Sequence, residues 1–153
     1  MSRVARVTGS VPIRPEAAVD LWSDVRRWPS FVEGFARVLE QTGEWPAQGA
    51  KVVWESGPGG RGRVTEKVTE RSPRSLAARV AEERLIGVQS FSATEGEGGE
   101  GSVVELALDY ELTSGSALKG IADALFVRRA VRDALGRTLR RYAVEAQEDA
   151  GLR

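Results

Sequence analysis

Arg128 is the side chain whose chemistry is least expected at its position. On a helical wheel of about 100° per residue, it lies within ~20° of Leu135, in the middle of an apolar stripe. A guanidinium stays charged in proteins and is almost never buried without a partner. Either the helix starts late or kinks near Phe126, or Arg128 extends past its neighbours to water. Alternatively, it pairs with Glu66 or Glu82, or its fork of donors holds an anionic or carbonyl oxygen of a ligand.

Tyr110 and two glutamates are the other polar groups that the pattern directs inward. Tyr110 places a hydroxyl in an otherwise apolar row of residues, and a buried hydroxyl needs a hydrogen-bond partner. Glu66 and Glu82 fall on the inward faces of expected strands, although a single β-bulge would reverse either face. A carboxyl group that donates a proton near neutral pH needs a raised pKa, which burial supplies. These residues are candidates for orienting a ligand, and no catalytic residue is assigned.

Aromatic side chains are the candidates for the wall of an apolar site. Trp28, Phe31 and Phe35 lie in a short segment that Pro29 and Gly34 interrupt, so the segment cannot bury all three rings against itself. Plain core and the closed end of a cavity fit these three rings about equally well. We predict a cavity wall with Arg128 and Tyr110 as its orienting polar groups; the predicted ligand-binding residues are Trp28, Phe31, Phe35, Trp54, Glu66, Leu108, Tyr110 and Arg128.

The composition excludes several classes of site. The 153 residues include no cysteine and no histidine, which removes thiolate zinc sites, cysteine nucleophiles, Ser-His-Asp triads and most transition-metal sites. Lys+Arg and Asp+Glu number 22 each, so the chain has no net charge that would favour nucleic acid. The first residues lack the apolar core of a signal peptide, and no run approaches the ~18 apolar residues of a membrane span. We therefore expect a cytoplasmic protein without cofactor, metal or stable membrane insertion, and the oligomeric state is left open.

Two glycine-rich stretches, residues 57–62 and 96–101, match the pattern G-x-G-x-x-G. A dinucleotide site requires this pattern between a strand and a helix, so that the pyrophosphate meets the helix N-terminus. Both stretches lead into expected strands, and the second carries two glutamates that would repel phosphate. We predict that both are hairpin loops.

The elements that must position these side chains are strands followed by one long helix. Helical periodicity predicts a helix over about Ser116–Gln147, and shorter helical segments over Glu16–Val25 and Trp28–Phe35. Strands in succession before a helix indicate an antiparallel sheet with helices on one face, an α+β architecture. The seven expected strands cover Arg3–Ile13, Arg37–Thr42, Lys51–Ser56, Gly62–Arg71, Ser75–Arg84, Ile86–Thr94 and Ser102–Thr113.

The order of these elements and several of their residues carry a family resemblance. The residues are Gly9–Glu16 running into Val19–Val25, the aromatic-proline segment Trp28–Phe31, and the last strand with the long helix. Together they resemble the START-like superfamily, also called SRPBCC, whose branches include the birch-pollen allergen, polyketide cyclase/dehydrase and coenzyme Q-binding proteins. The resemblance implies one helix-grip domain over residues 1–153, in which a curved antiparallel sheet encloses the C-terminal helix around an apolar cavity. It also implies a small hydrophobic ligand, and it transfers no catalytic set.

These observations predict a protein that binds a hydrophobic small molecule, such as a lipid, a polyketide or a quinone-like compound, between sheet and helix. An alternative is an enzyme of the polyketide cyclase/dehydratase type acting on an aromatic polyketide-like substrate. Tyr110, Glu66 or Glu82 would then carry protons, while the cavity would hold a flexible chain in one reactive conformation. A third possibility is a lipid- or quinone-handling interaction module.

Overall fold

The computed structural model describes residues 3–113 and 121–151, with side chains described from residue 125 in the second range. The elements follow the predicted order of one strand, short helices, a run of strands and one long helix. They are β1 (Arg3–Val11), α1 (Pro15–Ser23), the 3-10 turn η1 (Val25–Arg27), α2 (Trp28–Phe31), β2 (Phe35–Thr42), β3 (Lys51–Ser56), β4 (Arg63–Ser72), β5 (Ser75–Ala81), β6 (Leu85–Glu95), the 3-10 turn η2 (Glu97–Gly99), β7 (Ser102–Leu112) and α3 (Ile121–Gly151).

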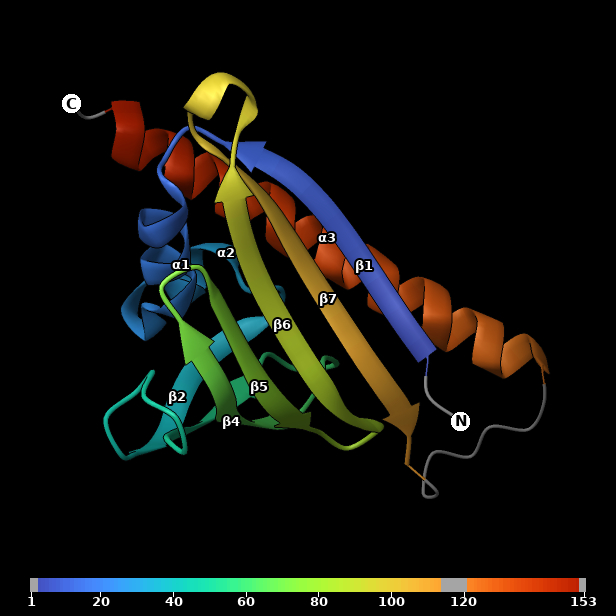
Figure 1. Cartoon of the computed structure of the whole chain (residues 1–153). Coiled ribbons are helices and arrows are strands. Elements are labelled where there is room, and N and C mark those ends of the chain that lie inside the picture. Colours follow the sequence, from blue (N-terminus) through green and yellow to red (C-terminus); the bar gives the residue numbers. More distant parts are fainter. Residues whose placement is uncertain (1–2, 114–120, 152–153) are drawn as a thin grey trace.

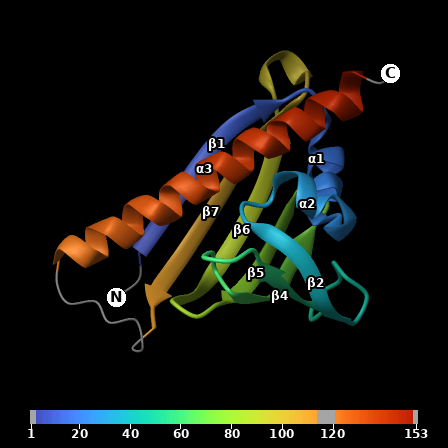
Figure 2. The ribbon, with the colours of Figure 1, turned by 180° about the vertical axis from the view of Figure 1, so that it is seen from behind.

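The strands form one antiparallel sheet of seven strands in the order β1-β7-β6-β5-β4-β3-β2. The sheet curves, and α3 runs along one of its faces beside β1, with α1 and α2 near the C-terminal half of that helix (Figure 1 and, from behind, Figure 2). The predicted α+β helix-grip architecture is thereby confirmed. The cavity between sheet and helix is the region where a ligand site was expected.

Element boundaries differ from the predicted ones mainly around the aromatic segment. The helix α2 ends at Phe31, and the chain turns at Gly34, whose φ of +75° favours glycine. Phe35 therefore begins β2 instead of closing a helical turn. The long helix continues past the expected end at Gln147 to Gly151, while its expected start at Ser116 lies outside the described residues. Both glycine-rich stretches lie in strand-to-strand loops, as predicted.

The core contains an aromatic cluster contributed by elements far apart in the sequence. Trp22 of α1 stacks on Phe91 of β6, with ring centroids 4.8 Å apart and planes 3° from parallel. Tyr142 of α3 packs edge-on against both rings, and its hydroxyl donates a 2.6 Å hydrogen bond to the carbonyl oxygen of Ala18. Aromatic pairs contribute to stability beyond the effect of their buried area. This cluster therefore stabilises the packing of α1 and α3 against the sheet.

The period-2 pattern correctly indicates which side chains of the sheet face α3. In β7, Leu106, Leu108 and Tyr110 are buried, as expected from their alternation with charged residues. In β4, Glu66 is also buried as predicted, whereas Glu70 is exposed. A bulge between residues 68 and 70 shifts the register there, which reverses the face of the residues that follow.

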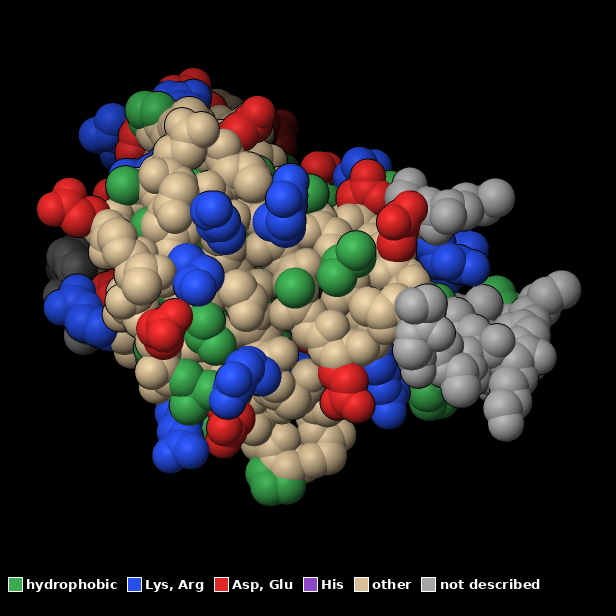
Figure 3. Space-filling view, turned by 90° about the horizontal axis from the view of Figure 1, so that it is seen from below, with side chains coloured by type: hydrophobic (Ala, Val, Ile, Leu, Met, Phe, Trp, Pro, Cys, Tyr) green, Lys and Arg blue, Asp and Glu red, His purple; other side chains and the backbone are tan. Residues whose placement is uncertain are grey.

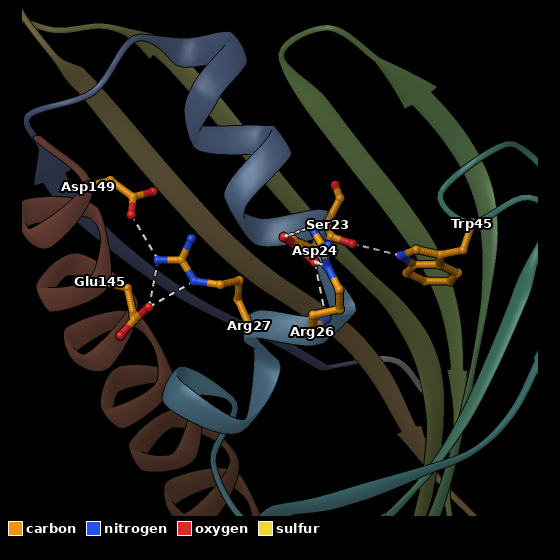
Figure 4. A network of polar contacts seen from close by, with 7 residues as sticks. All are labelled: Ser23, Asp24, Arg26, Arg27, Trp45, Glu145 and Asp149. Carbon is orange, nitrogen blue, oxygen red and sulfur yellow. Dashed lines mark hydrogen bonds and ion pairs between the residues drawn. The ribbon is translucent and has the colours of Figure 1, made fainter.

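Ion pairs connect η1, the turn that leads into α2, with the C-terminal half of α3. The guanidinium of Arg27 donates from Nη2 to Glu145 at 2.7 Å and to Asp149 at 2.9 Å (Figure 4). Beside it, Asp24 accepts hydrogen bonds from Arg26, and the indole of Trp45 donates to the carbonyl oxygen of Ser23. The pKa of Arg27 is raised by the hydrogen bonds to its two carboxylate partners. This network fixes where α2 and its aromatic residues lie over the sheet.

The surface mixes charges of both signs. On the face seen from below, Lys and Arg side chains alternate with Asp and Glu side chains and with hydrophobic ones (Figure 3). Within the described residues, no helix combines the length and the apolar character needed to cross a membrane. Nor do Asp or Glu residues gather there in a group that could hold a metal ion.

Candidate ligand-binding site

A cavity of about 160 Å³ lies between the sheet, α3 and the segment that carries α2. Its apolar wall comes from three sides: Trp22, Trp28 and Val32 from the helical segment, Leu85, Leu106 and Leu108 from the sheet, and Phe126, Val127, Ala130, Val131, Ala134 and Leu135 from α3. Its polar lining consists of Glu33, Arg61, Glu66, Glu82, Arg84, Gln89 and Thr138. An apolar cavity of ~150 Å³ accommodates benzene, so this one accommodates a single ring.

Glu66 is the most buried ionisable group on the cavity wall. It lies on β4 opposite Val52 of β3, and only 7% of its surface is exposed. The indole Nε1 of Trp54 donates a 2.7 Å hydrogen bond to Oε2 of Glu66, while Oε1 receives none from a described residue. Burial raises the pKa of Glu66, and neither the Trp54 hydrogen bond nor the charge of Arg61 reverses this shift. The structure therefore presents a carboxyl group with one oxygen uncommitted.

Arg61 and Glu82 form the second polar feature of the same wall. Nε of Arg61 donates a 2.5 Å hydrogen bond to Oε2 of Glu82, whose side chain is only 7% exposed. The Arg61 guanidinium also lies 5.2 Å from the centroid of the Trp54 ring, within range of a cation–π interaction. Arg128 was one candidate partner for Glu82. The structure shows instead that Arg61, from the loop between β3 and β4, forms the ion pair with Glu82. Glu66 has no ion pair with Arg128 either.

The remaining polar groups of the lining differ in how many hydrogen bonds they already receive from the protein. Glu33, in the turn after α2, receives hydrogen bonds from Arg137 at 3.0 Å and Arg141 at 2.7 Å. Its backbone N–H donates to the hydroxyl of Thr138, which attaches the turn to α3. Gln89 of β6 makes no side-chain hydrogen bond with a described residue, so its amide remains available to a ligand.

Of the predicted site residues, Trp28, Glu66 and Leu108 lie on the cavity wall. Phe31 and Trp54 are fully buried and lie behind the wall. Phe31 supports Trp22 with ring centroids 5.7 Å apart, and Trp54 holds Glu66. Phe35 packs against Trp28 and Trp54 and lines a separate surface groove beside β2.

Tyr110 and Arg128 lie elsewhere. Tyr110 is buried on the same face of β7 as Leu108, but its hydroxyl has no hydrogen-bond partner within the described residues and does not line the cavity. Burial raises the pKa of Tyr110. The side chain of Arg128 is exposed, and Phe126 nearby is 70% exposed. The helical wheel gives the direction of Arg128 around the axis, but not how closely the sheet approaches that part of α3.

Sequence reasoning missed several of the polar residues that line the cavity. Arg61 lies in a glycine-rich loop without periodicity, so no pattern in the sequence indicated its direction. Gln89 was detectable, because it is two residues from buried Phe91 in β6 and therefore shares its face. Trp22, whose helical spacing with Ala18 and Val25 predicts a core position, contributes both to the aromatic cluster and to the cavity wall.

Comparison with known proteins places these features in context. A sequence model of the family described as polyketide cyclase / dehydrase and lipid transport matches residues 3–147. No curated protein matches the chain.

Several solved structures are similar in fold. The ZhuI aromatase/cyclase of Streptomyces sp. R1128 is 16% identical, with a TM-score of 0.80 over 98% of this chain and 96% of that one. The di-domain aromatase/cyclase StfQ of the steffimycin pathway is 15% identical, with a TM-score of 0.78 over 99% of this chain and 52% of that one. Norcoclaurine synthase from Thalictrum flavum, in complex with dopamine and hydroxybenzaldehyde, is 12% identical, with a TM-score of 0.71 over 97% of this chain and 88% of that one. At these identities, the likeness concerns the fold.

Proposed function

Because the chain belongs to the polyketide cyclase / dehydrase and lipid transport family, we propose that it binds a small hydrophobic molecule between the sheet and α3. The ligand has about the size of one ring and carries a polar group. Trp28 and Leu108 contact the ring, and Glu66 and Gln89 contact the polar group. Trp54 acts indirectly, by orienting Glu66.

The observation that carries this proposal is the composition of the cavity wall. Small-molecule sites are mostly apolar, with a few placed polar groups that fix orientation. Here twelve apolar residues enclose the space, and an oxygen of Glu66 and the amide of Gln89 have no hydrogen bond from the described protein. A ligand that supplies the missing partners gains hydrogen bonds without breaking any that the protein makes.

The norcoclaurine synthase structure shares the fold of this chain at 12% identity. That protein holds dopamine and hydroxybenzaldehyde, which are single-ring molecules, in a chain of the same fold. A ligand of this class matches the volume of about 160 Å³ found here. A longer polyketide or lipid would place only one end in the cavity and extend past Phe126 to solvent.

Titration calorimetry with benzyl alcohol tests the proposal. The ligand offers one ring and one hydroxyl, and we expect saturable binding to the wild-type protein. Ala134→Leu fills the cavity from α3 and should abolish binding without unfolding the protein. Ala81→Leu, at an exposed position on β5, is the matched control and should bind as the wild type does. Equal binding by both variants, or none by the wild type, would contradict the proposal.

A second candidate function, a cyclase or dehydratase reaction, is favoured by the place of Glu66 on the cavity wall, where it is buried and has one oxygen without a hydrogen bond from a described residue. Burial also raises the pKa of Glu66, the direction that a general acid requires. In a dehydration, Glu66 would protonate a β-hydroxyl that leaves as water, while the α-proton passes to solvent and a double bond forms. Incubation with a β-hydroxyketone, followed by mass spectrometry for loss of water, tests this role. Turnover that persists in Glu66→Gln would eliminate Glu66 as the acid.

A further inference from the structure

The carboxyl groups on the cavity wall differ in whether a positively charged side chain pairs with them. Five of the lining residues are charged, namely Glu33, Glu66, Glu82, Arg61 and Arg84. Two guanidiniums of α3 bind Glu33, and Arg61 binds Glu82. The charge of each of these carboxylates is therefore balanced by a cation within hydrogen-bond distance.

Glu66 is the exception on this wall. More than nine-tenths of its surface is buried. Among the described residues, its only hydrogen bond comes from the uncharged indole of Trp54, and its second oxygen is uncommitted. Arg61 contributes an attractive charge but gives its hydrogen bond to Glu82. Arg84 is exposed, so water and salt screen its charge. This part of the cavity wall thus contains two buried carboxyl groups, Glu66 and Glu82, and one guanidinium that binds only the second of them.

We propose that the cavity selects a single-ring ligand with a protonated amine, whose ammonium group pairs with Glu66, over the same ring with an anionic group. The inference rests on the proposed function and specifies its ligand class. An ammonium group donates hydrogen bonds to the uncommitted oxygen. It also supplies the positively charged partner that the Glu66 carboxylate lacks among the described residues. A ligand carboxylate would instead face Glu66, whose ionised form has no ion pair with a described residue, at a like-charge cost.

Binding of such an amine also has a defined proton balance. Where Glu66 is protonated in the free protein, formation of the ammonium–carboxylate pair releases one proton to solvent, and no covalent bond of the ligand changes. The groups that act on Glu66 are Trp54, Arg61 and Glu82. Arg84 and Glu33 are the other charged residues that line the same cavity. Calorimetry in two buffers of different ionisation enthalpy measures the released proton directly.

Three ligands with the same ring test the selectivity at neutral pH: benzylamine, benzyl alcohol and benzoate. We expect benzylamine to bind at least about 10-fold more tightly than benzyl alcohol, the factor that corresponds to 1.4 kcal/mol, and benzoate to bind most weakly. Glu66→Gln keeps an oxygen for Trp54 and should bring the ratio of benzylamine to benzyl alcohol affinity close to one. Glu83→Gln removes the same charge from an exposed side chain outside the cavity and should leave that ratio unchanged.

The outcomes separate this inference from the proposed function. Binding of benzyl alcohol that is as tight as that of benzylamine, or tighter binding of benzoate, would overturn the amine selectivity alone. An unchanged ratio in Glu66→Gln would remove Glu66 as its cause. Failure of all three ligands to bind to folded wild-type protein would overturn the proposed function itself. The wild-type comparison remains decisive even where Glu66→Gln does not fold.

Discussion

Replacing Glu66 by glutamine should change how the stability of the protein depends on pH. Burial raises the pKa of Glu66 in the folded protein above its ordinary value of 4.5. Over pH values between the unfolded and folded pKa, the native state therefore binds more protons than the unfolded state. The contribution of Glu66 to stability is fully present below the unfolded pKa and is lost as the pH rises through the folded pKa.

The size of the effect follows from the same linkage. Within that window, Glu66 lowers the free energy of unfolding by up to about 1.4 kcal/mol for each pH unit of increase. Glutamine does not titrate, has nearly the same shape, and can still accept the Trp54 hydrogen bond. The difference in free energy of unfolding, variant minus wild type, should therefore increase with pH and become constant above the folded pKa.

Urea denaturation of both proteins at intervals from about pH 5 to about pH 8 measures this difference across the range in which a raised carboxyl pKa lies. Glu83→Gln serves as the matched control, because it makes the same substitution at an exposed position outside the cavity. A difference for Glu66→Gln that stays constant or decreases with pH would refute the reasoning. In that case, Glu66 would be ionised in the native protein over the whole pH range of the experiment. Groups other than Trp54 and Arg61 would then have to offset the cost of burying its charge.

Three further substitutions test the packing around the site. Tyr142→Phe should lower the free energy of unfolding by about 1–2 kcal/mol, because it removes the donor to the buried carbonyl of Ala18. Tyr110→Phe should be neutral or stabilising, since its hydroxyl has no hydrogen-bond partner among the described residues. Equal losses of the two variants in urea denaturation would contradict this contrast. Arg27→Ala should cost about 1 kcal/mol at low salt and less at high salt, because the Arg27 side chain is 34% exposed and screened. Thermal unfolding at two salt concentrations measures this, and a loss independent of salt would indicate packing instead.

Much of the fold was predictable because its signals are local. Alternation along β7 placed Leu106, Leu108 and Tyr110 on the inner face, and the helical spacing of Leu135, Leu139 and Tyr142 identified the buried side of α3; all six are buried. Such periodicities depend only on the geometry of a single strand or helix. Register is not local, which is why the bulge in β4 that turns Glu70 outward was anticipated only as a possibility.

The site was less predictable because it depends on distances between elements. The sequence indicated that Glu66 and Glu82 point inward, but not that Arg61 from a glycine-rich loop reaches Glu82. For Arg128, the wheel gave an orientation around the helix axis, whereas exposure is decided by how far α3 stands from the sheet. Arg128, one candidate for holding a polar group of the ligand, is therefore exposed, whereas Glu66 lies on the cavity wall.

The strand order has a consequence for biosynthesis. The first strand, β1, has β7 as its only described partner in the sheet, and Arg3 lies opposite Tyr110. While a ribosome is still translating the intervening segment, β1 exposes a free edge, and Trp22 has neither Phe91 nor Tyr142 to stack on. Contacts between residues so far apart in sequence form slowly, and exposed apolar surface favours aggregation. The apolar surface of β1 and α1 therefore stays uncovered until β7 and α3 have emerged.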